Sequence, residues 1–124
     1  MKATFSIDVE RDLKTLGSKG VRIGIPLLLT LLRKHQIRAT FFVTGEILAR
    51  HPALMKRVKK EGHEVGLHGY SHARFDDLVH TEKEREIKLS VAAYKRIFHT
   101  LPSGFRAPQH SIDKDTLHLL EQYK

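Results

Sequence analysis

The sequence contains no cysteine and no apolar run long enough to cross a membrane, and each absence excludes a class of function. Without cysteine there is no disulfide framework, no thiolate nucleophile and no sulfur ligand, so any metal site must use histidine and carboxylate groups. A membrane-spanning helix needs about 20 predominantly apolar residues in a row, so we expect no membrane partner. The first residues form no basic-then-apolar leader, and a cytoplasmic location is therefore expected.

Length, composition and charge are those of a single soluble domain. The 124 residues are 40% hydrophobic and 29% charged, and domains of about 100–150 residues are the most common. We therefore predict one domain over residues 1–124. The formal net charge is +8, but the basic residues are spread along several predicted helices and seldom lie beside aromatic residues. This pattern favours solvated helix faces, and we expect no nucleic-acid partner.

Strand-like and helix-like segments alternate along the chain. The predicted strands, each a short run of apolar or β-forming residues, cover residues 4–7, 38–43, 63–67 and 105–107. Helices are predicted over residues 25–35, 52–60 and 81–98, and a last one through Leu120 that is capped by Ser111 or Asp113. Thr81 and Glu84 match a capping box. The alternation predicts an α/β fold with parallel strands and right-handed crossovers.

Polar residues that can carry chemistry come where the predicted strands end. Ligands of parallel sheets bind at the carboxyl ends of the strands. In the order of the four strands, the candidates at that edge are Asp8 and Glu10, Thr44, His68 and His72, and Arg106 and His110. We therefore expect these side chains to face one site.

His68 and His72 are four positions apart, a spacing at which two imidazoles can bind one metal ion. With a carboxylate from Asp8 or Glu10 they would form a two-histidine, one-carboxylate set. Such a set suits zinc or another first-row divalent ion and leaves positions open for water and substrate. The set predicts metal-assisted hydrolysis, in which a second carboxylate takes the proton of water and Arg106 orients that carboxylate.

Each of these residues also has a simpler explanation. The chain has nine histidines, so a spacing of four arises easily by chance. Asp8 and Glu10 also suit a turn, and Arg106 also suits a surface ion pair. Their convergence at one edge of one sheet is what favours a site.

Four segments match the motifs of one known family in order and in spacing. They are Thr4–Glu10, Arg38–Gly45, Gly62–His72 and Gly104–Pro108. On these segments the chain resembles the polysaccharide deacetylases, the NodB-homology domain of the carbohydrate esterases. The resemblance implies parallel β/α repeats that form about half of a distorted (β/α) barrel. It also implies a metal-dependent hydrolase that removes acetyl groups from N-acetylated sugars or cleaves a related linear amide.

The resemblance further implies roles for the site residues. Asp8 matches the base that activates water, and Arg106 matches the arginine that steadies this base. His68 and His72 match metal ligands, for zinc above all, with cobalt, nickel or iron as alternatives. Most of the family has two adjacent aspartates, the second of which binds the metal. Here a valine follows the first aspartate, and Glu10 is the candidate for the third ligand.

Two departures limit what the resemblance implies. Gly69 stands where the family usually has Ser or Thr, so a hydrogen bond around the metal ligands is expected to be missing. A (β/α) barrel typically needs about 200 residues or more, and the family's apolar pocket for the acetyl methyl and its histidine general acid have no counterpart here. The alternative function is therefore a shortened, non-catalytic homologue that keeps the metal site and binds a glycan or a partner chain.

A half barrel also exposes a strand edge and an apolar face, both of which invite pairing with another chain. We therefore predict a homo-oligomer in which a second copy completes the barrel.

Overall fold

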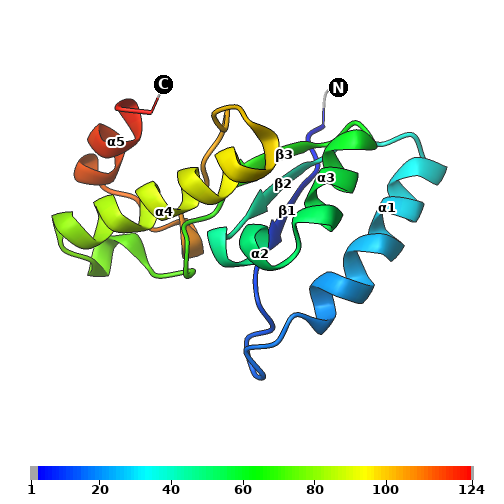
Figure 1. The fold of residues 1–124 in the computed structure, drawn as a ribbon, viewed down its shortest axis with the longest axis horizontal. Coiled ribbons are helices and arrows are strands. Elements are labelled where there is room, and N and C mark those ends of the chain that lie inside the picture. The colour runs from blue at the N-terminus through cyan, green and yellow to red at the C-terminus, as the bar shows by residue number, and fades with distance from the viewer. Residues whose placement is uncertain (1–2, 124) are drawn as a thin grey trace.

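Three short parallel strands form the central sheet of the protein (Figure 1). The structure is a computed structural model, and it describes residues 3–123. The strands β1 (Ser6–Val9), β2 (Thr40–Val43) and β3 (Glu64–Leu67) lie in the order β1-β2-β3. Their carboxyl ends are level, because Val9 pairs with Val43 and Val43 pairs with Leu67. The α/β fold with parallel strands is the one that the sequence predicts.

The connections between the strands are helical. Among residues 3–123 the α-helices are α1 (Ile25–Lys34), α2 (Gly45–Arg50), α3 (Pro52–Lys60), α4 (His80–Phe98) and α5 (Lys114–Glu121). Shorter helical turns are η1 (Gly20–Gly24), η2 (Phe75–Asp77) and η3 (Pro108–His110). In Figure 1, α5 lies beside the first turns of α4. None of the helices described combines the length and the apolar character needed to pass through a bilayer.

The sheet has one buried face and one open face. Phe41, Val43 and Val65 alternate with other residues along the strands and are almost completely buried in the core formed with the helices. Side chains of a strand point to opposite faces in turn, so the intervening residues point the other way. Two of these, Asp8 and Phe42, are exposed or partly exposed. The open face therefore leaves Asp8 accessible near the carboxyl edge of the sheet.

The prediction of a fourth strand at residues 105–107 is wrong. Phe105 makes one isolated parallel bridge to Leu67, in which the backbone N–H of Arg106 donates to the carbonyl of Leu67 at 2.9 Å. The ladder does not continue, because the carbonyl of Arg106 accepts a hydrogen bond from the ring of His68, and Pro108 has no N–H to donate. The segment nevertheless brings Arg106 beside the end of β3.

The first strand is shifted from its predicted position, and one helix was not predicted. β1 begins and ends two residues later than expected, so Asp8 lies within the strand and Glu10 directly follows it. α2 was not predicted, because the glycine at position 45 indicates the end of a strand. In the structure Gly45 instead begins the helix, directly after the last residue of β2 and Thr44.

The helix caps confirm one sequence prediction and correct another. Asp113 caps α5, since its Oδ1 accepts a backbone N–H of the first turn at 2.8 Å. The capping box predicted at Thr81 and Glu84 is wrong, because the backbone N–H of Val79 donates to Glu82 Oε2 at 3.1 Å. The helix therefore begins one residue earlier than predicted.

Lys83 connects α4 to α5, and we expect this contact to stabilise the fold in a pH-dependent way. The buried ammonium donates to Asp113 Oδ2 at 2.5 Å and to Asp115 Oδ2 at 3.3 Å. The hydrogen bond from Lys83 holds the pKa of Asp113 well below its usual range. A lowered pKa in the folded state gives stability that is present above the unfolded pKa, near 4, and is lost as the pH falls through the folded one.

The Asp113→Asn variant tests this contact, because asparagine caps a helix about as well as aspartate does and only the charge is lost. We expect its Tm to be lower than that of the native chain at pH 7, and the difference to shrink as the pH falls below about 4. The matched control is Asp77→Asn, since the side chain of Asp77 is 74% exposed. An Asp113→Asn chain with the same Tm as the native chain at every pH would contradict the assignment.

Candidate metal centre

His68 directly follows β3 and is held in one orientation. Only 1% of the residue is exposed, and its Nδ1 lies 2.7 Å from the carbonyl oxygen of Arg106. A carbonyl only accepts, so Nδ1 carries the proton and Nε2 keeps its lone pair in the neutral ring. Burial lowers the pKa of His68, although the hydrogen bond to Arg106 and the charge of Asp8 act in the opposite sense. His68 is therefore held as a neutral imidazole with Nε2 free to bind a cation.

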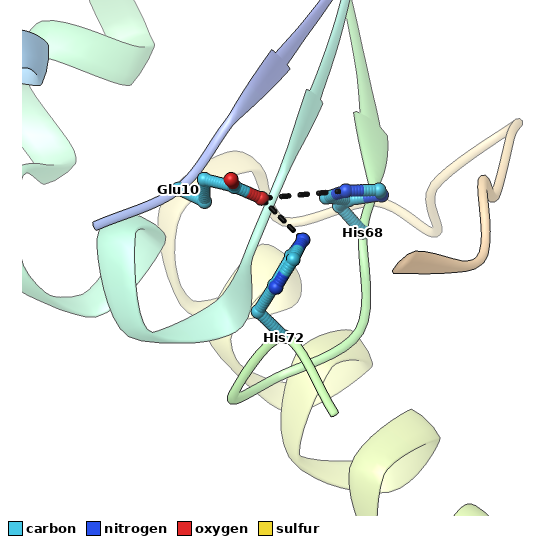
Figure 2. Close-up of side chains that lie close together, drawn as sticks. All are labelled: Glu10, His68 and His72. Atoms are coloured by element: carbon cyan, nitrogen blue, oxygen red, sulfur yellow. Dashed lines mark ion pairs between the residues drawn. The ribbon is translucent and has the colours of Figure 1, made fainter. Parts of the chain in front are cut away.

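Glu10 and His72 complete a group with His68, as Figure 2 shows. The Oε2 atom of Glu10 lies 3.7 Å from His68 Nε2 and contacts His72 Nε2 directly. One ligand atom from each of the three residues lies within 4.8 Å of the other two. The donors come from the end of β1, the end of β3 and the loop after β3, so the level strand ends bring them together.

His72 adopts a backbone conformation that residues other than glycine seldom adopt. Its φ is +69°, in the left-handed region that costs a non-glycine residue of this kind energy. Gly69, earlier in the same loop, has a φ of +70°, which glycine adopts freely. These two turns reverse the loop so that the ring of His72 faces Glu10. This arrangement of two imidazoles and one carboxylate fits a divalent cation such as zinc.

Asp8 and Arg106 form a second pair beside this group. Arg106 Nη1 donates to Asp8 Oδ1 at 2.8 Å, and Asp8 Oδ2 lies 3.9 Å from His68 Nε2. Arg106 is itself fixed, because its Nη2 donates to Ser6 Oγ at 2.8 Å and its guanidinium lies 4.2 Å from the ring centroid of Phe42. One carboxylate oxygen is thus occupied by the arginine, while the other faces His68.

The loop from His68 to His72 depends on Glu86, a residue of α4 that sequence reasoning missed. Glu86 Oε2 accepts from the backbone N–H groups of Tyr70 and Ser71 at 2.8 and 3.0 Å, and its Oε1 accepts from the Ser71 hydroxyl at 2.8 Å. The sequence gives no signal for this role, because Glu86 is one of several acidic residues in α4. Only packing selects it to hold the loop.

Gly69 has a structural reason to lack a side chain. A Cβ at this position would lie 3.2 Å from the ring of Phe75, and the positive φ disfavours any other residue. The nearest serine or threonine in the loop is Ser71, whose hydroxyl donates to Glu86 Oε1 at 2.8 Å. Gly69 has no hydroxyl to donate a hydrogen bond. The loop that carries the histidines is instead fixed by the carboxylate of Glu86 from α4.

Two of the residues expected at this edge lie outside the group. Thr44 is 2% exposed and precedes α2, where its backbone N–H donates to the carbonyl of Val9 at 3.0 Å. His110 is exposed and is not one of the three grouped metal donors among residues 3–123. The five remaining candidates are brought together.

Gly45 also controls the position of this loop, and Gly45→Ala is expected to weaken metal binding. A Cβ at residue 45 would lie 2.3 Å from Cδ2 of Tyr70 and 3.2 Å from the backbone of Ser90. Tyr70 would have to move, and it is part of the loop that carries His72. We expect the zinc dissociation constant, measured by competition with a chelating dye, to rise by about 10-fold, as for other changes around metal ligands.

The matched control for this variant is Gly24→Ala. Gly24 precedes α1 in a helical conformation, and a Cβ there has no atom within 4 Å. This variant should bind zinc like the native chain. Equal zinc affinity in Gly45→Ala and Gly24→Ala would show that the Tyr70 contact does not position the loop.

Comparison with known proteins points to one family. A sequence model described as polysaccharide deacetylase matches residues 19–124, a range that begins after Asp8 and Glu10. The chain is 35% identical over 98 residues to the peptidoglycan deacetylase of Helicobacter pylori. This alignment covers 79% of the chain and 33% of that protein. It is 32% identical over 92 residues to the peptidoglycan-N-acetylglucosamine deacetylase of Bacillus cereus. This alignment covers 74% of the chain and 34% of that protein. The chain therefore spans about a third of the length of these relatives.

A solved structure shares the fold over nearly the whole chain. The family 4 carbohydrate esterase of Streptomyces lividans, solved in complex with acetate, superimposes with a TM-score of 0.84 at 22% identity. The match covers 98% of this chain and 58% of the esterase chain. The three strands and their helices thus form about half of a (β/α) barrel domain, as the family resemblance implies.

Proposed function

The chain belongs to the polysaccharide deacetylase family, and we propose that it acts as a metal-dependent hydrolase on an N-acetylated sugar or a related linear amide. The observation that carries this proposal is the group of Glu10, His68 and His72 beside the pair of Asp8 and Arg106. Two relatives named for deacetylation of peptidoglycan support a carbohydrate substrate. The bond cleaved would be the C–N bond of an acetamide, giving acetate and an amine.

We propose zinc as the ion held by Glu10, His68 and His72. Two imidazoles and one carboxylate are a set that catalytic zinc uses, although cobalt, nickel and iron suit the same donors. When bound, the ion would polarise the acetyl carbonyl and make a nearby water more acidic. His68 is prepared for this role, because its Nδ1–H is engaged by the carbonyl of Arg106 and its Nε2 is left free.

Asp8 is the proposed base. Arg106 holds its Oδ1 at 2.8 Å, which leaves Oδ2 on the side of the histidines. A carboxylate oriented in this way can accept the proton of water as the water oxygen adds to the acetyl carbon. The proton then passes to the nitrogen of the departing amine. Arg106 would act by positioning Asp8, since its guanidinium is held by Ser6 and Phe42 as well.

A second candidate function is a non-catalytic homologue that keeps the metal site and binds a glycan or a partner chain. The observation that favours it is the exposure of Asp8, whose side chain is 36% accessible on the open face of the sheet. Closing a site around the reacting groups expels bulk water and strengthens the electrostatic interactions inside it, whereas Asp8 is open to solvent. The open face would then serve as a binding surface.

Turnover separates the two functions. Protein loaded with one equivalent of zinc would be incubated with a chitin-type N-acetylglucosamine oligomer, and released acetate would be measured by an enzyme-coupled assay. We expect acetate release that a chelator abolishes and added zinc restores. Oligomer binding without any acetate release, with zinc bound, would favour the non-catalytic homologue and contradict the hydrolase.

We also propose that two copies of the chain associate. β1 is an edge strand of the sheet, and Ile23, Leu27 and Leu31, which are 51%, 67% and 53% exposed, form one stripe with a spacing of four residues. Open strand edges and apolar stripes favour association. We expect size-exclusion chromatography with light scattering to give a dimer at micromolar concentration, and Leu27→Asp to give a monomer.

Val79→Asp is the control for this variant, since Val79 is 63% exposed at the start of α4, outside the stripe. The Val79→Asp chain should remain dimeric. A native chain that elutes as a well-behaved monomer at micromolar concentration would contradict the proposed association.

A further inference from the structure

A pocket of about 360 Å³ lies between α2, the first turns of α3 and the second half of α4. It is separate from the metal group, none of whose residues lines it. Of its apolar lining residues, Leu48 and Ile97 are buried, whereas Leu89 is 37% exposed. Binding pockets in proteins typically have volumes of about 300–1,000 Å³ and largely apolar walls with a few polar groups. This pocket has that size and that character.

The charged groups that line this pocket are cationic. Lys56 from α3 and Arg96 from α4 both line it, and within residues 3–123 no acidic side chain does. Neither Lys56 nor Arg96 forms an ion pair with an acidic residue of that part of the chain. Two unpaired cations beside an apolar wall are complementary to a molecule with an apolar body and an acidic head.

Tyr70 joins this pocket to the loop from His68 to His72, which we call the metal loop. Its ring lines the pocket and lies against Gly45, where a Cβ would be only 2.3 Å from Cδ2. Its backbone is the midpoint between His68 and His72, and it is bonded on both sides, by its N–H to Glu86 at 2.8 Å and by its carbonyl to the N–H of Glu46 at 3.1 Å. A molecule in the pocket would therefore contact a residue of the metal loop itself.

We propose that this pocket binds an amphiphilic carboxylate or sulfonate and that its occupation strengthens metal binding. The apolar body would lie against Leu48, Leu89 and Tyr70, and the acidic head would lie between Lys56 and Arg96. A body packed on the ring of Tyr70 holds this ring on Gly45, and so favours the loop conformation in which His72 faces Glu10. The pocket itself is independent of the proposed hydrolase, whereas the coupling rests on the proposed metal group.

The test uses 8-anilinonaphthalene-1-sulfonate, whose fluorescence rises when it enters an apolar site, with decanoate as a competitor. The metal-free chain should bind one equivalent, and decanoate should displace it. In the double variant Lys56→Glu, Arg96→Glu, the dissociation constant should rise by about 10-fold or more, which corresponds to the loss of about 1.4 kcal/mol. The matched control is Lys60→Glu, Lys95→Glu, which reverses two exposed charges on the same helices outside the pocket and should bind the dye as the native chain does.

The coupling is measured by repeating the titration with saturating zinc. Linkage requires zinc to strengthen dye binding by the same factor by which the dye strengthens zinc binding, and we expect about fivefold, within the usual range of coupling between sites. Equal dye binding by the native chain and both double variants would overturn the pocket. Dye binding that depends on Lys56 and Arg96 but not on zinc would overturn the coupling. Zinc content is measured on the same sample, so a failure of the metal group, in which no zinc is bound, is distinguishable from a failure of the coupling, in which zinc is bound and dye affinity is unchanged.

Discussion

Replacing both His68 and His72 with alanine is expected to remove metal binding from the protein. The two rings supply two of the three grouped donors, and their Nε2 atoms face the same oxygen of Glu10. Changes to residues around the ligands, with all ligands still in place, weaken metal binding by up to about 100-fold. The double variant leaves only one carboxylate of the three donors, so we expect the zinc dissociation constant to rise by more than about 100-fold. Isothermal titration of the metal-free chain with zinc would measure the change.

The matched control removes two histidines that lie elsewhere. His35 and His118 are exposed, at the end of α1 and within α5. The double variant His35→Ala, His118→Ala should bind one equivalent of zinc with the native affinity. Because His68 is buried, circular dichroism should accompany the titration to show that the His68→Ala, His72→Ala chain is folded. A folded double variant that binds zinc as the native chain does would contradict the site.

Zinc binding should also weaken in acid. A metal ligand must be neutral at the nitrogen that binds, so protons compete with zinc for the two rings. Burial lowers the pKa of His68, so this ring stays neutral to a lower pH than a free imidazole, whose pKa is about 6.5. The competition at His68 should therefore begin below the ordinary histidine range.

Replacing Asp8 with asparagine is expected to reduce acetate release by about 100-fold to 10,000-fold, the contribution that a general base usually makes. Asparagine keeps the size of the side chain and can still accept from Arg106, which donates to Asp8 Oδ1 at 2.8 Å. It has no charge with which to take a proton from water. The turnover number of the zinc-loaded chain with the N-acetylglucosamine oligomer is the measurement, and zinc content is measured on the same sample.

Zinc content distinguishes a base from a ligand. If Glu10 is the third ligand, Asp8→Asn should keep one equivalent of zinc, whereas Glu10→Gln should lose affinity. Asp77→Asn, at an exposed aspartate in η2, should keep both zinc and activity. Loss of zinc from Asp8→Asn together with full retention by Glu10→Gln would assign the ligand to Asp8 and contradict the role of base.

The convergence of the candidate residues was largely predictable because parallel strands place their carboxyl ends at one edge. His68 and His72 follow one strand, and Asp8 and Glu10 belong to another, so the order of the elements alone brings them to the same edge. The sequence left the choice between the two carboxylates open. The structure puts the Glu10 oxygen nearer to both rings than that of Asp8, because Asp8 lies within β1 and is held by Arg106.

The features that sequence reasoning missed depend on contacts between distant segments. Glu86 supports the metal loop only because α4 crosses next to it. The segment at Arg106 has the composition of a strand, yet the carbonyl of Arg106 accepts a hydrogen bond from the ring of His68 and not from a neighbouring strand. Gly45 predicts a turn, but in the structure it begins a helix, and the absence of a Cβ there leaves room for the ring of Tyr70. Local propensity contains none of these contacts.

The most direct test of the metal site is a crystal of the zinc-loaded protein measured at the zinc absorption edge, paired with elemental analysis of the same preparation. We predict one zinc per chain and one anomalous peak bounded by Glu10, His68 and His72, about 2.0–2.1 Å from the two Nε2 atoms. A preparation with one zinc per chain whose anomalous peak lies at other residues, with none between His68 and His72, would contradict the account.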